Sequence, residues 1–139
     1  MARSLRTAVA GLAFGEHHAR TLANMPDATL VAVADHAQDR VDRIAATYGC
    51  VPYRDAEKMI EAESLDVVTV CVSPSRREPI LRAAVDAGVA LFVEKPWASN
   101  LAHAHELASI CEAANAPVMC GFSFRFHPVV RRAVELVRG

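Results

Sequence analysis

The residues DVVTVCV at positions 66–72 are the stretch that decides the fold of this chain of 139 residues. A continuous run of β-branched and small apolar residues predicts a strand buried on both faces, as strands are in a parallel sheet covered by helices. Weaker runs of the same kind lie on either side of it. We expect further strands at residues 7–10, 29–34, 51–52, 89–93 and 117–121.

Helical patterns fill the intervals between these runs. We expect helices at residues 16–25, 37–48, 56–62 and 99–114, one that ends at Ala87, and a last one that begins at Pro128. Ser75 and Glu78 match an S-x-x-E capping box, and Ser99 is a second expected helix cap. This alternation predicts a doubly wound parallel sheet of the Rossmann type, in three layers α/β/α.

Composition is that of a soluble globular protein, with 53% apolar and 22% charged residues. The net charge of −1 gives no reason to expect binding to nucleic acid or to a membrane. The four cysteines form no C-x-x-C pair, which indicates reduced thiols in a cytoplasmic protein, and no Cys/His cluster has metal-site spacing. Arg3 and Arg6 before the apolar run 7–15 resemble a short signal peptide, but this run fits a first strand and turn better.

The loops at the carboxyl ends of the strands are the place to look for a ligand site, because open parallel sheets bind ligands there. The first of these loops reads Gly11-Leu12-Ala13-Phe14-Gly15 and leads into a helix, an arrangement that suits a pyrophosphate. It departs from G-x-G-x-x-G, because Ala13 stands at the second glycine and the turn is one residue short. A tight turn that binds no ligand is the alternative.

Asp35 ends the second predicted strand. Its separation from Gly11 along the sequence is close to the separation expected between the glycine turn and an acid that hydrogen-bonds a ribose diol. Such an acid repels a ribose 2′-phosphate, so NAD is favoured over NADP as the cofactor. Arg40, in the first turn of the next helix, could instead bind that phosphate. A helix N-cap is the alternative role of Asp35.

Glu94, Lys95 and Pro96 follow the fifth predicted strand at the same edge of the sheet. A lysine ammonium in this place can hydrogen-bond a substrate hydroxyl or carbonyl and help to move its proton. Pro96 would fix the bend that directs the lysine. A surface Glu–Lys pair at the end of a strand is the alternative.

Residues along nearly the whole chain share the pattern of one family. They are Gly11 to His18 with Ala19 and Leu22, Asp35, Tyr48-Gly49, Asp66 to Val68, Pro74, Ala87-Gly88, Glu94 to Pro96, and Gly121 through Arg125 to Pro128. On these residues the chain resembles the N-terminal domain of the glucose–fructose oxidoreductase / inositol dehydrogenase / MocA family. The resemblance implies an NAD(P)-dependent oxidoreductase that acts by hydride transfer on a sugar, polyol or related hydroxy or carbonyl substrate.

The resemblance also implies roles for individual residues. Lys95 would be the catalytic residue of this domain, Gly11 to Gly15 would hold the pyrophosphate, and Asp35 the adenosine ribose. Ser73 and Pro74 would line the cofactor groove. The remaining expected cofactor contacts are Arg40, Glu94, Pro96 and Arg125, the last of these near a domain junction.

The chain departs from the family pattern at two residues and in its length. Arg77 stands where the family often has histidine, and Trp97 where a smaller aliphatic residue is common. The resemblance implies that family members continue into a second, α+β substrate domain, and we expect this domain to be missing from the chain. We expect residues 1–122 to form the dinucleotide-binding domain and residues 123–139 to begin the connection to that domain, and we expect the chain alone to be inactive.

Two other readings remain open at this point. The chain could be a non-catalytic module that binds a dinucleotide or a partner, with the apolar stripe of its last helix covered by a second copy in a homo-oligomer. It could also be an S-adenosylmethionine methyltransferase, which shares the glycine turn and the acid after the second strand. The methyltransferase reading gives no account of residues 94–96.

Overall fold

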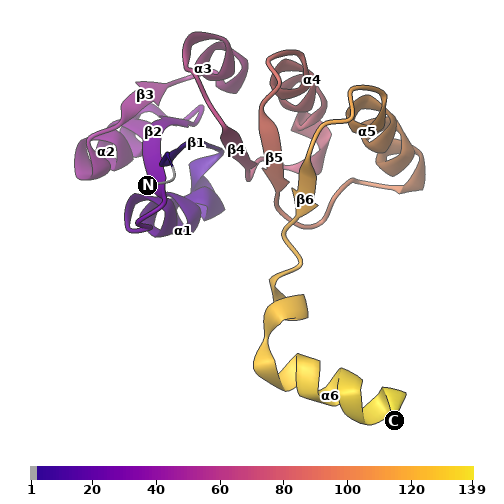
Figure 1. Ribbon diagram of the computed structural model, residues 1–139. Coiled ribbons are helices and arrows are strands. Elements are labelled where there is room, and N and C mark those ends of the chain that lie inside the picture. The colour runs from indigo at the N-terminus through magenta and orange to yellow at the C-terminus, as the bar shows by residue number, and fades with distance from the viewer. Residues whose placement is uncertain (1–2) are drawn as a thin grey trace.

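The computed structural model describes residues 3–139, which build one six-stranded sheet with helices packed against it (Figure 1). The strands are β1 (Leu5–Ala10), β2 (Ala28–Ala34), β3 (Val51–Tyr53), β4 (Val67–Val70), β5 (Ala90–Val93) and β6 (Val118–Cys120). The helices are α1 (Leu12–Ala23), α2 (Gln38–Tyr48), α3 (Ala56–Ala62), α4 (Glu78–Asp86), α5 (Leu101–Ala113) and α6 (Pro128–Arg138), with short 3-10 turns η1 (Pro74–Arg76) and η2 (Ser123–Phe126).

The sheet has the strand order β3-β2-β1-β4-β5-β6, and every neighbouring pair of strands is parallel. The predicted doubly wound parallel sheet is therefore confirmed. Because all strands run the same way, the loops that follow them all leave the sheet at one edge.

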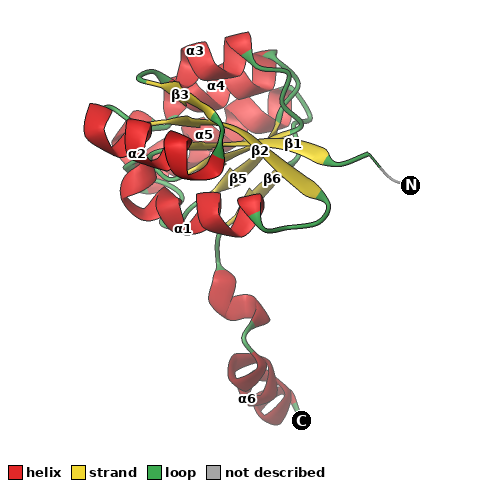
Figure 2. Ribbon diagram, turned by 90° about the vertical axis from the view of Figure 1, so that its left-hand side faces the viewer, coloured by secondary structure: helices red, strands yellow, loops and turns green. Residues whose placement is uncertain are grey.

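The two faces of the sheet carry separate apolar cores. Val9 and Val33 pack toward α1 and α2, whereas their neighbours Ala8, Ala10 and Ala34 pack toward α3, α4 and α5. This division follows from the alternation of side chains along each strand. Figure 2 shows α3 and α4 above the strands and α1 beneath them, so the three-layer α/β/α arrangement is confirmed.

The start of α1 differs from the expectation. The helix begins at Leu12 rather than at residue 16, because Gly11 already serves as its N-cap residue. The segment expected to be an extended phosphate loop is thus the first helical turn itself.

The expected caps of α4 and α5 are wrong. Pro79 lies in the first turn of α4, where proline is favoured, so the helix starts at Glu78 and the expected capping box with Ser75 does not form. Asn100, and not Ser99, caps α5 by accepting a hydrogen bond from the backbone amide of His103 at 2.9 Å.

α6 extends away from the sheet and from the other helices (Figures 1 and 2). Pro128 begins it, as expected, and its predicted apolar side chains lie along one exposed side. Neither α6 nor any other helix within residues 3–139 is both long and apolar enough to cross a membrane.

The turn after β1 lies against the backbone that follows β4. Gly11 has a positive φ of 87°, and a Cβ added to it would lie 2.8 Å from the amide nitrogen of Val72 and 2.9 Å from the carbonyl carbon of Cys71. Backbone atoms cannot rotate away from such a contact. Gly49 also has a positive φ, of 67°, but an added Cβ there meets nothing within 4 Å.

This contrast predicts unequal effects of alanine at the two glycines. Gly49→Ala should lower the free energy of unfolding by about 1–2 kcal/mol, from the left-handed backbone alone. Gly11→Ala should add about 1–3 kcal/mol to that loss, because of the overlap with Val72 and Cys71. Urea denaturation followed by circular dichroism measures both, and equal losses would contradict the close approach of the two turns.

Candidate functional site

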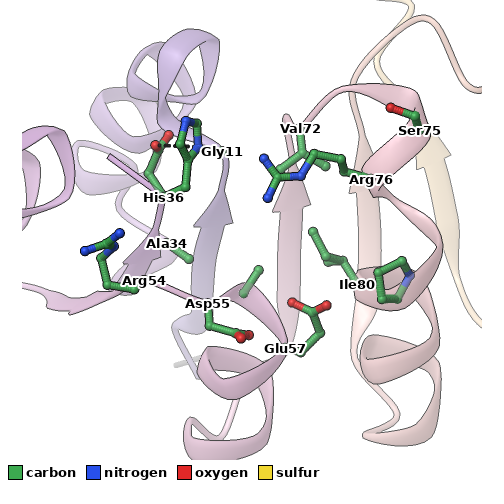
Figure 3. Close-up of a pocket in the computed structure, with 13 residues that line it drawn as sticks. Gly11, Ala34, His36, Arg54, Asp55, Glu57, Val72, Ser75, Arg76 and Ile80 are labelled. Atoms are coloured by element: carbon green, nitrogen blue, oxygen red, sulfur yellow. Dashed lines mark ion pairs between the residues drawn. The ribbon is translucent and has the colours of Figure 1, made fainter. Parts of the chain in front are cut away.

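The loops that leave β1, β2, β3 and β4 at their carboxyl ends surround a pocket of about 400 Å³ (Figure 3). This volume is within the range of small-molecule sites. The lining residues are Gly11, Ala34, Asp35, His36, Arg54, Asp55, Ala56, Glu57, Val72, Ser75, Arg76, Pro79 and Ile80. The glycine turn and the acid that ends β2 therefore meet in one pocket.

The first turn of α1 presents backbone amides at this edge. The first amides of a helix have no partner within the helix, and they carry the positive end of its dipole. The amide of Leu12 donates to Oδ2 of Asp35 at 2.6 Å. Ala13 and Phe14, which follow it, are exposed, so this turn is open to an anionic ligand.

Gly15 allows α1 to pack closely against the sheet. A Cβ added to it would lie 2.8 Å from Cγ1 of Val9 and 3.3 Å from Cβ of Cys71. Close packing of helix on strand is the task of the last glycine in G-x-G-x-x-G. Gly15 thus corresponds to the last glycine of the motif, and Gly11 makes the turn before the helix.

The Leu12 side chain does not fill the pocket. The side chain of Leu12 is fully buried in the core between the sheet and the helices α1 and α2. The exposed side of the turn is formed instead by Ala13 and Phe14. The turn thus keeps an open face although it lacks a glycine at position 13.

Asp35 is almost completely buried, with 3% of its side chain exposed, and both of its oxygens accept hydrogen bonds. Besides the Leu12 amide, its partners are the amide of Ala37 at 2.9 Å and Nη1 of Arg40, which is 3.0 Å from each oxygen. Burial disfavours the charged form, but the bonds from Ala37, Leu12 and Arg40 outweigh it and hold the pKa of Asp35 below its ordinary value. The carboxylate is therefore ionised at neutral pH.

The bonds of Asp35 connect two loops. Ala37 is a local partner, as in the helix-cap role that was the alternative for this residue, but Leu12 belongs to the turn after β1. Asp35 thus ties the glycine turn to the loop after β2. Arg40 lies at the site as well, and its charge is already paired with Asp35.

Three further basic side chains line the pocket at positions that sequence reasoning missed. His36 lies with Nδ1 3.3 Å from Oδ1 of Asp35. Arg54 directly follows β3, and Arg76 lies in η1 after β4. The carboxyl-edge rule identifies Arg54 once the short third strand is included among the strands to inspect.

Lys95 follows β5 at the same edge of the sheet. It is exposed, and its Nζ lies 5.7 Å from the centre of the Phe14 ring, beside the first turn of α1. The peptide bond between Lys95 and Pro96 is cis. Since β1 and β4 separate β2 from β5, Lys95 and Asp35 lie toward opposite ends of the edge.

Glu94 bonds to the protein around it rather than to the Lys95 ammonium. It is 9% exposed, its Oε1 lies 3.1 Å from Nε2 of His18, and its Oε2 accepts the backbone amide of Lys95 at 2.9 Å. Gly121 packs closely beside it, because a Cβ there would lie 3.1 Å from Oε1. Of the two residues, Lys95 is at the surface and Glu94 is buried, and no ion pair between their side chains is found within residues 3–139.

The remaining expected residues lie around the pocket or away from it. Ser73 is exposed, with its Oγ 3.4 Å from Oγ of Ser75, and Pro74 begins η1. Arg125 is exposed in η2 and is not among the residues that line the pocket. Within residues 3–139, no three or more His, Cys, Asp or Glu side chains are grouped so that they could hold a metal ion.

The strand order, the helix that starts directly after β1 and the acid that directly follows β2 define a dinucleotide-binding Rossmann domain. The chain belongs to the GFO_IDH_MocA family, described as an oxidoreductase family with an NAD-binding Rossmann fold, whose pattern matches residues 5–122. The family resemblance seen in the sequence is thereby confirmed.

Curated relatives are sugar and inositol dehydrogenases. The chain is 30% identical to a D-apiose dehydrogenase of Paraburkholderia graminis over 126 residues, which cover 90% of this chain and 34% of the relative. It is 31% identical to an inositol 2-dehydrogenase of Rhizobium meliloti over 124 residues, which cover 87% of this chain and 37% of the relative. The chain thus spans little more than a third of the length of these relatives.

A solved structure agrees with this assignment. The crystal structure of a myo-inositol 2-dehydrogenase from Lactobacillus plantarum matches with a TM-score of 0.90 at 26% identity. The match covers 98% of this chain and 41% of that one.

The lowered pKa of Asp35 predicts a loss of stability in acid. An unfolded Asp35 takes up a proton before the folded one does, so its contribution is present above the ordinary aspartate pKa of 3.8 and is lost as the pH falls below it. In Asp35→Asn the free energy of unfolding should therefore fall less steeply between about pH 5 and about pH 2. Urea titrations at several pH values measure the slope.

The exposed Asp27 offers a matched control. Asp27→Asn should keep the acid slope of the wild type. An unchanged slope in Asp35→Asn would show that the bonds from Leu12, Ala37 and Arg40 do not hold this carboxylate in its charged form.

Proposed function

We propose that this chain is the cofactor-binding half of an NAD(P)-dependent oxidoreductase that transfers a hydride to or from a sugar, polyol or related hydroxy or carbonyl compound. Residues 1–122 would form the dinucleotide-binding domain, and residues 123–139 would begin the connection to a substrate domain. The observation that carries the proposal is the arrangement along one sheet edge, with Asp35 toward one end, the open start of α1 between, and Lys95 toward the other.

The residues of this edge fit an extended dinucleotide. The exposed first turn of α1, with the small Ala13 in it, offers amides and the positive end of a helix to a pyrophosphate. Asp35 would accept hydrogen bonds from the hydroxyls of the adenosine ribose, once Arg40 or His36 gives up its place on the carboxylate. The pocket beside Asp35 would hold the adenosine.

When bound, the nicotinamide would supply the hydride acceptor or donor. Lys95 would donate a hydrogen bond from its ammonium to the substrate oxygen. This bond would stabilise the negative charge that develops on the oxygen as the hydroxyl and carbonyl forms interconvert. Glu94 supports this role through its bond to the backbone amide of Lys95. Ser73, Pro74 and Pro96 would contribute to the walls of the groove.

The proposed substrate class follows the names of the relatives, which are dehydrogenases of apiose and inositol. Lys95 is exposed, so water reaches the place where hydride transfer would occur. We therefore infer that the chain binds the cofactor but does not turn over substrate by itself. Its four unpaired cysteines fit a reducing, cytoplasmic compartment.

The charge at the end of β2 favours NAD. Asp35 is ionised and would repel a 2′-phosphate, and the Arg40 guanidinium that could attract this phosphate already has Asp35 as its partner. His36 and Arg54 line the same pocket and could bind a 2′-phosphate, so we expect the preference for NAD over NADP to be partial.

Titration calorimetry with NAD and NADP tests the cofactor assignment. NAD should bind about tenfold more tightly than NADP, and Asp35→Asn should narrow this ratio to about twofold. Glu57→Gln removes another carboxylate that lines the pocket and should leave the ratio unchanged. If neither dinucleotide binds at millimolar concentration, the cofactor-binding assignment is wrong.

A dehydrogenase assay tests whether the cofactor-binding half turns over substrate by itself. The isolated chain, mixed with NAD and a panel of sugars and inositols, should form no NADH above the rate without protein, although it binds NAD. Turnover by the chain alone would contradict this expectation and would also exclude the reading as a non-catalytic binding module.

A further inference from the structure

Arg77 is a buried cation close to the loop that carries Lys95. It is 2% exposed and occupies the N-cap position of α4. None of the ion pairs found among residues 3–139 includes it. Burial lowers the pKa of its guanidinium. A charge kept in such a place requires hydrogen-bond partners that offset its desolvation.

Three backbone carbonyls are these partners. Nε of Arg77 donates to the carbonyl of Val72 at 3.1 Å, just after β4. Nη1 donates to the carbonyl of Trp97 at 3.0 Å and to that of Pro96. The guanidinium thus joins the segment that leaves β4 to the two residues that follow Lys95.

The backbone of Lys95 is consequently held on both sides. Its own amide donates to Glu94, which is in turn fixed by His18 on α1. The next two carbonyls are held by Arg77. Between these two attachments the Lys95 side chain reaches the face of the Phe14 ring.

We propose that Arg77 is a positioning residue, which directs the Lys95 ammonium to the start of α1 by holding the carbonyls of Pro96 and Trp97. The proposal rests on the proposed function, because the position of Lys95 matters only where a cofactor and a substrate meet it. A lysine at position 77 would not replace the arginine, since it lacks the planar fork that bonds in two directions at once.

The chain contains two lysines, Lys58 and Lys95, so carbon-13 labelling of the lysine ε-carbon gives one Cε signal for each. The Phe14 ring should shift the ε-methylene protons of Lys95 upfield of those of the exposed Lys58. Loss of this difference in Phe14→Leu would assign it to the ring. The signal reports where Lys95 lies and needs no bound ligand.

In Arg77→Met and Arg77→Gln, which add no further lysine, the Lys95 signal should move to the position of the Lys58 signal. Arg82→Met removes a cation from the same helix, but one that is exposed and paired with Glu78, and it should leave the Lys95 signal in place. An unmoved Lys95 signal in either Arg77 variant would overturn the proposal. Failure of both variants to fold would overturn it too, because Arg77 would then be a core residue without a specific effect on Lys95.

Binding measurements separate this proposal from the proposed function. ADP-ribose lacks the nicotinamide, which is the part of NAD that would lie near Lys95. Arg77→Lys should therefore leave the affinity for ADP-ribose unchanged within about twofold and lower the affinity for NAD about fivefold. Equal weakening of both ligands would argue against a role confined to Lys95. If the wild type binds neither ligand but the Lys95 signal responds as expected, the cofactor assignment falls and the positioning of Lys95 by Arg77 stands.

Discussion

The distance between the turn after β1 and the backbone after β4 depends on the missing side chain of Gly11. Any Cβ there would collide with the backbone at Val72 and Cys71. The same turn continues directly into α1, whose first amide bonds to Asp35, and Gly11 and Val72 both line the pocket. Moving these two segments apart would displace the helix start, the bond to Asp35 and the pocket wall together.

Three buried charged side chains connect the loops of the site to one another. Asp35 joins the loops after β1 and β2, Glu94 joins the loop after β5 to α1, and Arg77 joins the segments after β4 and β5. Charge-assisted hydrogen bonds to backbone are strong and directional, so they fix loops that packing alone leaves free. The groups left exposed for a ligand, Lys95 and the first turn of α1, are thereby held in place before any ligand arrives.

Periodicity predicted the sheet because burial on both faces demands continuous apolar runs, and the parallel arrangement then placed Gly11, Asp35 and Lys95 at one edge. Arg54 was not predicted as a site residue, because β3 has only three residues and its strand pattern is weak. The burial of Arg77 could not be predicted from the sequence, because arginine side chains are mostly exposed in folded proteins. Its partners are backbone carbonyls, which every residue has, so no particular residue type marks them. The capping box failed because the position of Pro79 in the first turn overrode a purely local motif.

Gly121 leaves β6 at the edge that carries Lys95, with its amide bonded to the carbonyl of Val93 and its α-carbon against Glu94. The segment that follows this glycine therefore starts beside the loop of Lys95. Changes in the sequence after Gly121 would therefore alter the surroundings of Lys95 and Glu94 without altering the register of the sheet.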